Sequence, residues 1–160
     1  MKKLLFIAAL FLCSPAYATV GQISDLPSTI TIDGDGTLGG AQQECFYLFP
    51  TTPDADVVAD TDIYRVFVSD AFTFTSAVAY VNVTGTTDAV TIDLNEAGTT
   101  LLSTKLTLDA GENSSRTAAA PAVISDSAIA AGSVISLDVD DQDGGNTAAG
   151  LQVVVCGYYN

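Results

Sequence analysis

Histidine and tryptophan are absent from this chain of 160 residues, and basic residues are scarce. Five Lys and Arg residues stand against 19 Asp and Glu residues, which gives a formal net charge of −14. Without His, the chain lacks the commonest general base and a frequent ligand of zinc, copper and haem, which argues against most metal-dependent and triad chemistries. A negative field of this size repels nucleic acid and anionic lipid, so both are poor candidate partners.

Motifs of catalysis are also missing from the sequence. Glu occurs only at positions 44, 96 and 112, so the two acids that a glycosidase places across a cleft are poorly supplied. No GxSxG motif accompanies the many Ser and Thr residues. We therefore predict that the protein is not an enzyme. Lys105 is the only lysine after the first three residues, and we interpret it as a strand charge that discourages edge pairing.

The first 18 residues have the pattern of a cleaved secretory signal. Lys2 and Lys3 precede an apolar run from Leu4 to Leu12, and Ala16-Tyr17-Ala18 offers small residues for cleavage. The run is shorter than the ~20 residues that span a bilayer. We expect a soluble protein that is exported through the periplasm to the cell surface or the medium. Loss of both lysines with the signal changes the net charge from −14 to −16.

Two cysteines, Cys45 and Cys156, follow the signal. An even number of cysteines in an exported chain favours a disulfide bond between them. Such a bond would close a loop over most of the chain, for which the chain-entropy model gives ~4–5 kcal/mol of stabilisation. The alternative is a pair of buried free thiols.

Apolar and polar residues alternate in short runs bounded by Gly, Pro, Asp and Asn, which is the periodicity of β-strands. The clearest pair is the hairpin of residues 90–108, with its loop at Asn95-Glu96-Ala97-Gly98. The pattern predicts an all-β fold, an antiparallel β-sandwich of jelly-roll type in a single domain. The expected strands are 29–32, 45–49, 63–68, 72–83, 89–94, 100–108, 116–124, 134–139 and 151–158.

Three segments are expected along the chain. Residues 1–18 form the signal peptide, residues 19–40 a polar, Gly-rich N-terminal arm, and residues 41–160 the sandwich domain. The arm contains a short alternating run, Thr29, Ile30, Thr31 and Ile32, which is a candidate strand for self-assembly. An open sheet edge in a neighbouring copy would be a template for such a strand.

Clustered aspartates suggest a calcium site. Asp138, Asp140, Asp141 and Asp143 precede the turn Gly144-Gly145 and Asn146, and calcium takes six to eight oxygen ligands. Two further acidic clusters lie at 33–35 and 54–62. None of the three matches the EF-hand spacing. The alternative is that all three are solvated loops of an acidic surface.

Tyrosines offer a second kind of candidate contact. Tyr47 and Tyr64 fall on neighbouring predicted strands, and a Tyr ring with its polar tip on a sheet face is suited to sugar binding. The alternative is that these rings pack in the core or fill an interface.

From about Phe72 to Tyr158 the chain resembles a β-sandwich module of tailed-phage tail-fibre and other virion surface proteins. The matching stretches are FTFTSAVAYV (72–81), VTIDLNEAGTTLLSTKLTLDAGE (90–112), AVISDSAIAAGSVISLDVD (122–140) and AAGLQVVVCGY (148–158). The resemblance implies a structural or adhesive role and no enzyme activity. A secretory signal and a cysteine pair are typical of an exported relative of that module.

Together these features predict an exported, non-enzymatic structural or adhesion subunit of the cell surface or of a secreted, filamentous assembly. Its expected partner is a second copy of itself or a surface glycan or receptor. Two alternatives stay open: an extracellular carbohydrate-binding module and a phage virion surface protein. No cofactor other than calcium is expected.

Overall fold

The structure is a computed structural model that describes residues 31–32, 38–39, 43–145 and 147–160. The chain divides into two compact units, residues 1–40 and residues 41–160. In the first unit, β1 (Thr31–Ile32) pairs antiparallel with β2 (Leu38–Gly39). The second unit contains all the other strands.

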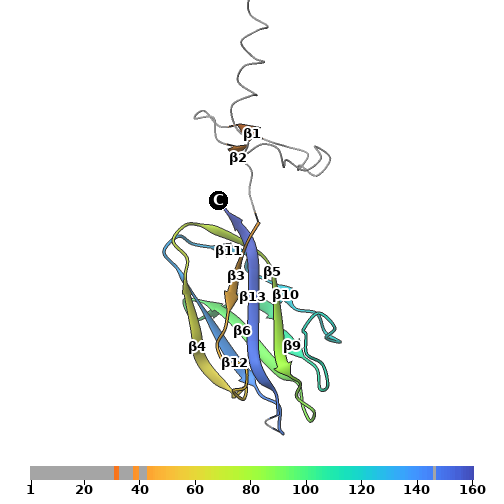
Figure 1. Cartoon of the computed structure of the whole chain (residues 1–160). Helices are drawn as coiled ribbons and strands as arrows, with labels where there is room; N and C mark the ends of the chain where they lie inside the picture. Colours follow the sequence, from red (N-terminus) through yellow and green to blue (C-terminus); the bar gives the residue numbers. More distant parts are fainter. Residues whose placement is uncertain (1–30, 33–37, 40–42, 146) are drawn as a thin grey trace, which may run out of the picture. The chain divides into compact units, whose positions relative to one another are not determined.

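Two antiparallel sheets form the second unit (Figure 1). The four-stranded sheet has the order β11 (Ala128–Ile129), β5 (Phe72–Val83), β13 (Ala149–Tyr159) and β3 (Gln43–Leu48). The five-stranded sheet has the order β4 (Asp60–Phe67), β12 (Val134–Asp141), β6 (Val90–Glu96) and β7 (Thr99–Thr100), with β9 (Leu106–Leu108) also paired to β6. A separate ribbon joins β8 (Leu102–Thr104) and β10 (Val123–Ile124). The all-β antiparallel sandwich expected from the sequence is confirmed.

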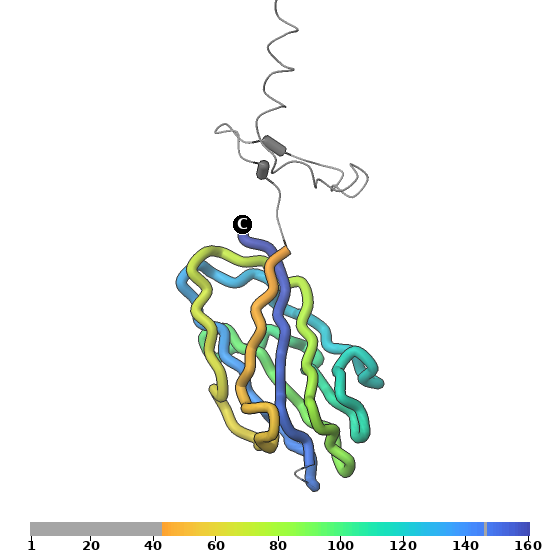
Figure 2. The backbone as a smooth tube through the Cα atoms, in the orientation of Figure 1, coloured from red at the N-terminus to blue at the C-terminus, as the bar shows by residue number. Residues whose placement is uncertain are grey.

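Strands at the start and the end of the unit alternate between the two sheets, whereas β6, β7 and β9 belong to the same sheet. The chain passes from β3 to β4, then to β5 and β6, and later from β11 to β12 and β13, changing sheet at each step. This order brings the first strand of the unit beside the last, so β3 and β13 run side by side (Figure 2). Within the described residues no strand lies beyond β3 or β4, so each forms an edge of its sheet.

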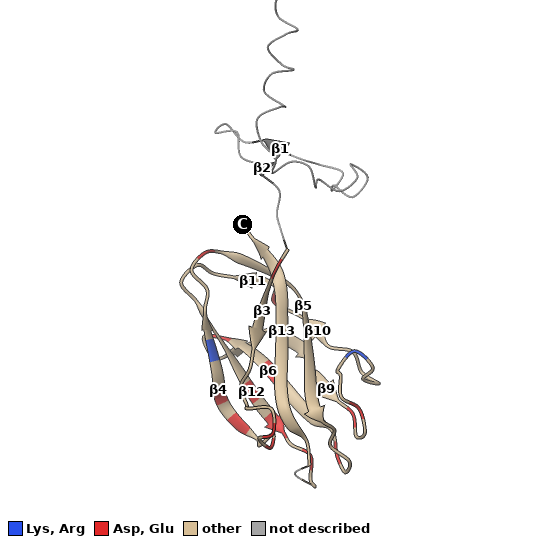
Figure 3. Cartoon of the chain, viewed as in Figure 1, with Lys and Arg blue, Asp and Glu red and all other residues tan. Residues whose placement is uncertain are grey.

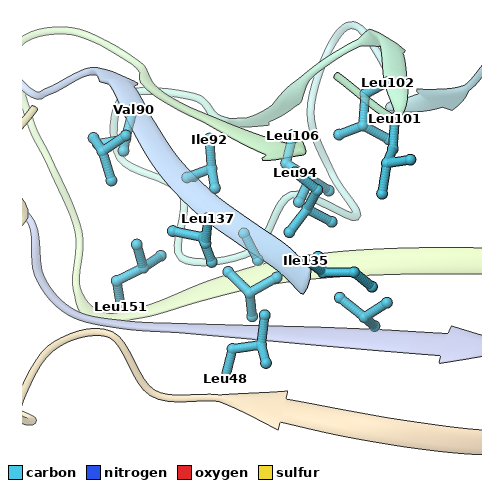
Figure 4. Packing of buried hydrophobic residues seen from close by; sticks show 14 of the residues in the cluster. Leu48, Val90, Ile92, Leu94, Leu101, Leu102, Leu106, Ile135, Leu137 and Leu151 are labelled. Atoms are coloured by element: carbon cyan, nitrogen blue, oxygen red, sulfur yellow. The ribbon is translucent and has the colours of Figure 1, made fainter. Parts of the chain in front are cut away.

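The core lies between the sheets and consists mainly of aliphatic side chains from alternate strand positions, joined by Phe72 and Phe74 (Figure 4). Leu48 and Leu151 project into it from the four-stranded sheet, while Ile92, Leu94 and Leu137 project from the five-stranded sheet. All five are buried. Burial of each such side chain stabilises the fold by about 1.5–3 kcal/mol, which explains why period-2 alternation is strong in β6, β12 and β13.

The hairpin at residues 90–108 is confirmed, but its turn is tighter than expected. Glu96 pairs with Thr99, so the loop is only Ala97 and Gly98. Their φ angles are 50° and 81°, the left-handed conformation that two-residue hairpin turns need. Gly98 adopts it freely, whereas Ala97 is one of only two non-glycine residues with positive φ in the described part of the chain.

Two expected strands differ from the structure. The run 100–108 is divided into β7, β8 and β9, because its register against β6 changes: Thr100 lies opposite Asn95, but Leu106 lies opposite Ile92, which leaves three extra residues on this side. The run 116–124 keeps strand geometry only in β10, and Ser115 just before it bonds to β5 instead, through Ala79. A short strand, β11, appears where none was expected.

No helix long and apolar enough to cross a membrane occurs among the described residues.

Candidate functional site

Among the strands of the two sheets, charged residues are concentrated on one sheet (Figure 3). Strands β3, β5, β11 and β13 contain a single charged residue, Glu44. The strands of the five-stranded sheet carry one arginine, Arg65, and seven acids: Asp60, Asp62, Asp93, Glu96, Asp138, Asp140 and Asp141. We call the outward side of this sheet, around Arg65, Asp93, Lys105, Asp138 and Asp140, the acidic face.

Lys105 lies at the centre of the acidic face, where it forms ion pairs with two aspartates. It precedes Leu106, which pairs with Ile92, so its side chain reaches the next residue of β6, Asp93. The Lys105 Nζ atom lies 3.0 Å from Asp93 Oδ2 and also donates to Asp140 Oδ2. The hydrogen bond to Asp140 is the main cause that raises the pKa of Lys105, and Asp93 adds to it. The sequence predicted that Lys105 is a charge that discourages edge pairing. In the structure it instead forms ion pairs with Asp93 on β6 and Asp140 on β12.

Asp93 is only 4% exposed although it lies on the outward side of its strand. Its Oδ1 atom accepts hydrogen bonds from the Leu94 amide (2.8 Å) and the Thr100 hydroxyl (2.6 Å). Asp138 stands directly opposite Asp93 across the β6–β12 pair, where two like charges repel each other. The Lys105 cation offsets this repulsion.

Asp138 is held by two other donors. The amide of Asp62 donates to its Oδ1 atom (2.6 Å), and the Asn95 side chain donates to its Oδ2 atom (2.9 Å). Asp62 in turn accepts a hydrogen bond of 2.5 Å from Arg65, which lowers the pKa of the Asp62 carboxyl, with Ser136 adding to the effect. The acids on this part of the sheet are thus tied into one hydrogen-bonded network.

A shallow hollow of about 220 Å³ lies beside this network. Asp62, Arg65 and Ser136 supply its polar side, and Ala97, Gly98 and Val134 its apolar side. Its lining is drawn from β4, β12 and the Ala97–Gly98 turn. This volume is below the range of about 300–1,000 Å³ that is usual for small-molecule sites.

Asp143 has a structural role that its sequence context did not reveal. Its side chain is fully buried, and its Oδ1 atom accepts from the amides of Thr87 (2.8 Å) and Asp88 (2.9 Å). Its Oδ2 atom accepts from the amide (3.0 Å) and the hydroxyl (2.7 Å) of Thr147. These donors, with the Asp88 amide first, hold the pKa of Asp143 far below its ordinary value. Asp143 therefore joins two loops.

The four aspartates expected to bind calcium do not converge. Asp138 bonds to β4 and β6, Asp140 to Lys105, Asp141 to the amide of Gln142, and Asp143 to its two loops. In the parts of the chain that the structure describes, no three His, Cys, Asp or Glu residues are placed to hold a metal ion. The hydrogen bonds that these carboxylates accept come from N–H and O–H groups of the protein.

The expected cysteine pair is bonded. Cys45 lies directly opposite Cys156 in the β3–β13 register, with a Cα–Cα distance of 4.1 Å. This separation is typical of a pair whose amides and carbonyls point away from each other. The Cys156 carbonyl accordingly accepts a hydrogen bond from Thr75 on β5, on the other side of β13. The amide and carbonyl of Cys45 therefore face the open edge of β3.

The two candidate glycan-contact tyrosines lie on different sheets. Tyr47 projects outward from β3 and is 64% exposed, whereas Tyr64 on β4 packs partly buried against the core. The structure therefore does not bring them together on one platform. Thr31 and Ile32 of the expected assembly strand form β1, while Thr29 and Ile30 lie outside the described residues, as does the signal peptide.

Sequence reasoning missed the partners of Asp93 and the pair formed by Asp62 and Arg65. A usable signal existed for Asp93 and Lys105, because both lie in the recognised hairpin at residues 90–108. Counting outward from a two-residue turn would not have placed them opposite each other, since the register against β6 shifts by three residues between β7 and β9.

Comparisons of this chain with protein-family models, with curated proteins and with solved structures found no match. The resemblance to phage surface modules therefore stays a prediction.

Proposed function

We propose that this protein is an exported, non-enzymatic structural or adhesion subunit that assembles with copies of itself. The observation that carries the proposal is the disulfide bond between Cys45 and Cys156, which joins the first strand of the sandwich to the last. Bonded cysteines persist in oxidising compartments such as the periplasm and the extracellular space, which agrees with the secretory pattern of residues 1–18. A bond of this kind is rare in proteins that assemble in the cytosol, which weighs against the virion alternative.

The position of the bond supports a mechanical role. Only Gln43 and Glu44 of β3 precede Cys45, and Gly157 to Asn160 follow Cys156. A pull applied between the two ends of the domain would pass from Cys45 to Cys156 through the sulfur atoms. The sheets between them would carry none of this load. Such a route is useful in a subunit that transmits tension along an assembly.

The open edge of β3 supports assembly by strand addition. The amides and carbonyls of Cys45, and by strand alternation those of Gln43 and Tyr47, face this edge. Unpaired main-chain groups of an edge strand are a template for a further strand. The alternating run Thr29 to Ile32 of a neighbouring copy is the segment that we propose for this place.

Electron microscopy and sedimentation of the secreted protein test the function. Filaments or discrete oligomers are expected from the intact chain, and deletion of residues 19–40 should reduce them. The variant that replaces both cysteines with serine serves as a control for the bond. A protein that stays monomeric at every concentration tested would overturn the assembly function.

A further inference from the structure

The outward side of the four-stranded sheet has a different character from the acidic face. In β13, Val153 and Val155 point into the core and are buried, while Gln152 and Val154 between them are partly exposed. Since alternate residues of a strand point to opposite faces, Gln152 and Val154 project outward. They mark the centre of a second exposed surface.

Neighbouring strands extend this surface. Tyr47 and Val78 lie opposite Val154 on either side, and Tyr80 lies opposite Gln152. Residues directly opposite in an antiparallel pair share a face. We call the surface formed by Tyr47, Val78, Tyr80, Gln152 and Val154 the β13 face. Two exposed aromatic rings therefore lie on a sheet face that bears no charge.

The distribution of charge determines which contact between two copies of the chain is favourable. The protein has a net charge of −14, and seven of its acids lie on the strands of the other sheet. Two copies that met through their acidic faces would set carboxylates against carboxylates, which is unfavourable. Two copies that met through their β13 faces would bury rings and aliphatic side chains and leave the acids on the outside.

We propose that two copies of this chain pack together through their β13 faces. The same charge argument applies to each copy, so the contact is isologous, with the same surface contributed by both. Tyr47 is its anchor, because an exposed ring among uncharged side chains is the kind of group that carries interface energy. This inference rests on the proposed assembly function and specifies one of its contacts, which is separate from strand addition at the β3 edge.

A matched pair of variants tests the contact. Tyr47 and Phe67 are exposed aromatic residues, 64% and 66% respectively, and each lies on the edge strand of its own sheet. Tyr47→Asp and Phe67→Asp add the same charge, the first on the β13 face and the second on the other sheet. Sedimentation velocity of the oxidised full-length secreted protein over a range of concentrations gives the association constant. Circular dichroism confirms that each variant is folded.

The expected result is a loss of about tenfold or more in association for Tyr47→Asp, with Phe67→Asp close to the wild type. Equal association of the two variants and the wild type would overturn the β13-face contact and leave the assembly function standing. A wild type that never associates would overturn both. A monomer whose binding to a glycan array is lost in Tyr47→Asp would assign the face to a sugar and overturn the contact between copies.

Hydroxyl-radical footprinting of the wild type tests the same contact without a variant. Tyr47 should become less reactive as the protein concentration rises, while Phe67 should keep its reactivity. Equal reactivity of Tyr47 at low and high concentration would overturn the proposal even if Tyr47→Asp fails to fold.

Discussion

Cys45 on β3 stands directly opposite Cys156 on β13, and the bond between them closes the sandwich at its first and last strands. The two residues are 111 positions apart in the chain, so the bond constrains nearly the whole domain in its unfolded state. This bond therefore affects both the stability of the domain and its response to a pulling force.

Removal of the bond should destabilise the fold strongly. Replacing both cysteines with serine releases the constraint on the unfolded chain, which for a loop of this length corresponds to about 4–5 kcal/mol. Urea unfolding of the oxidised wild type and the double variant measures the difference. The wild type treated with a reductant is the control and should match the variant. Equal unfolding midpoints for all three would contradict the prediction.

Force applied through the ends of the domain should not extend the oxidised protein. Cys45 and Cys156 are separated by 111 positions, and release of the chain between them would lengthen it by roughly 370–400 Å at full extension. Single-molecule pulling with handles at residues 41 and 160 should show this extension only after reduction. Its appearance in the oxidised protein would show that the bond is not formed.

Asp143→Asn should destabilise the domain at neutral pH. The substitution replaces one carboxylate oxygen by an NH2 group. This group would face either the amide of Thr147 or the amides of Thr87 and Asp88, which are themselves donors. Asp141→Asn is the matched control, since Asp141 is exposed and accepts a hydrogen bond from the amide of its neighbour Gln142. Unfolding by urea gives the two free energies, and equal losses would contradict the role of Asp143.

The contribution of Asp143 should also depend on pH. Because the pKa of Asp143 is lowered in the folded state, its stabilisation is complete above the ordinary value of 3.8. It is lost as the pH falls below that value towards the depressed pKa. The difference between the wild type and Asp143→Asn should therefore shrink in acid. A difference that stays constant across this range would count against an ionised Asp143.

Lys105→Met should destabilise the domain by about 1–3 kcal/mol, because it leaves the buried Asp93 carboxylate without its cation. The double variant Lys105→Met with Asp93→Asn should recover part of this loss, since the uncompensated charge is removed. Arg116→Met, at an exposed position, should change stability by less than about 0.5 kcal/mol. Thermal or urea unfolding of the wild type and these three variants measures the differences, and a double variant no more stable than Lys105→Met would argue against the ion pair.

Added salt should strengthen the association of two copies. The proposed contact is uncharged while the rest of each copy is acidic, so salt screens repulsion and breaks no ion pair in the interface. Sedimentation at low and high sodium chloride measures the change. Weaker association at high salt would indicate that ion pairs form the contact, and the β13 face would then be the wrong surface.

Local sequence patterns were sufficient for the strands and for the type of fold. The runs that became β5, β6, β12 and β13 alternate strongly, because each strand has one side in the core and one side outside. The disulfide could also be predicted from the sequence, since only two cysteines follow the expected signal. The run 116–124 was less informative, because Ser115 bonds to β5 instead of extending a strand.

What the sequence determined by itself was therefore the all-β class, most strand positions, the cysteine pair and the acidic character. The tertiary structure alone decided where the charges lie. Strands β4, β6 and β12 are far apart in sequence but share one sheet, so acids that are scattered along the chain meet on one face, while the strands of the other sheet carry only Glu44. Asp143 makes the same point: its neighbours in sequence suggested a calcium ligand, but its hydrogen-bond donors at Thr87 and Asp88 are more than fifty positions away.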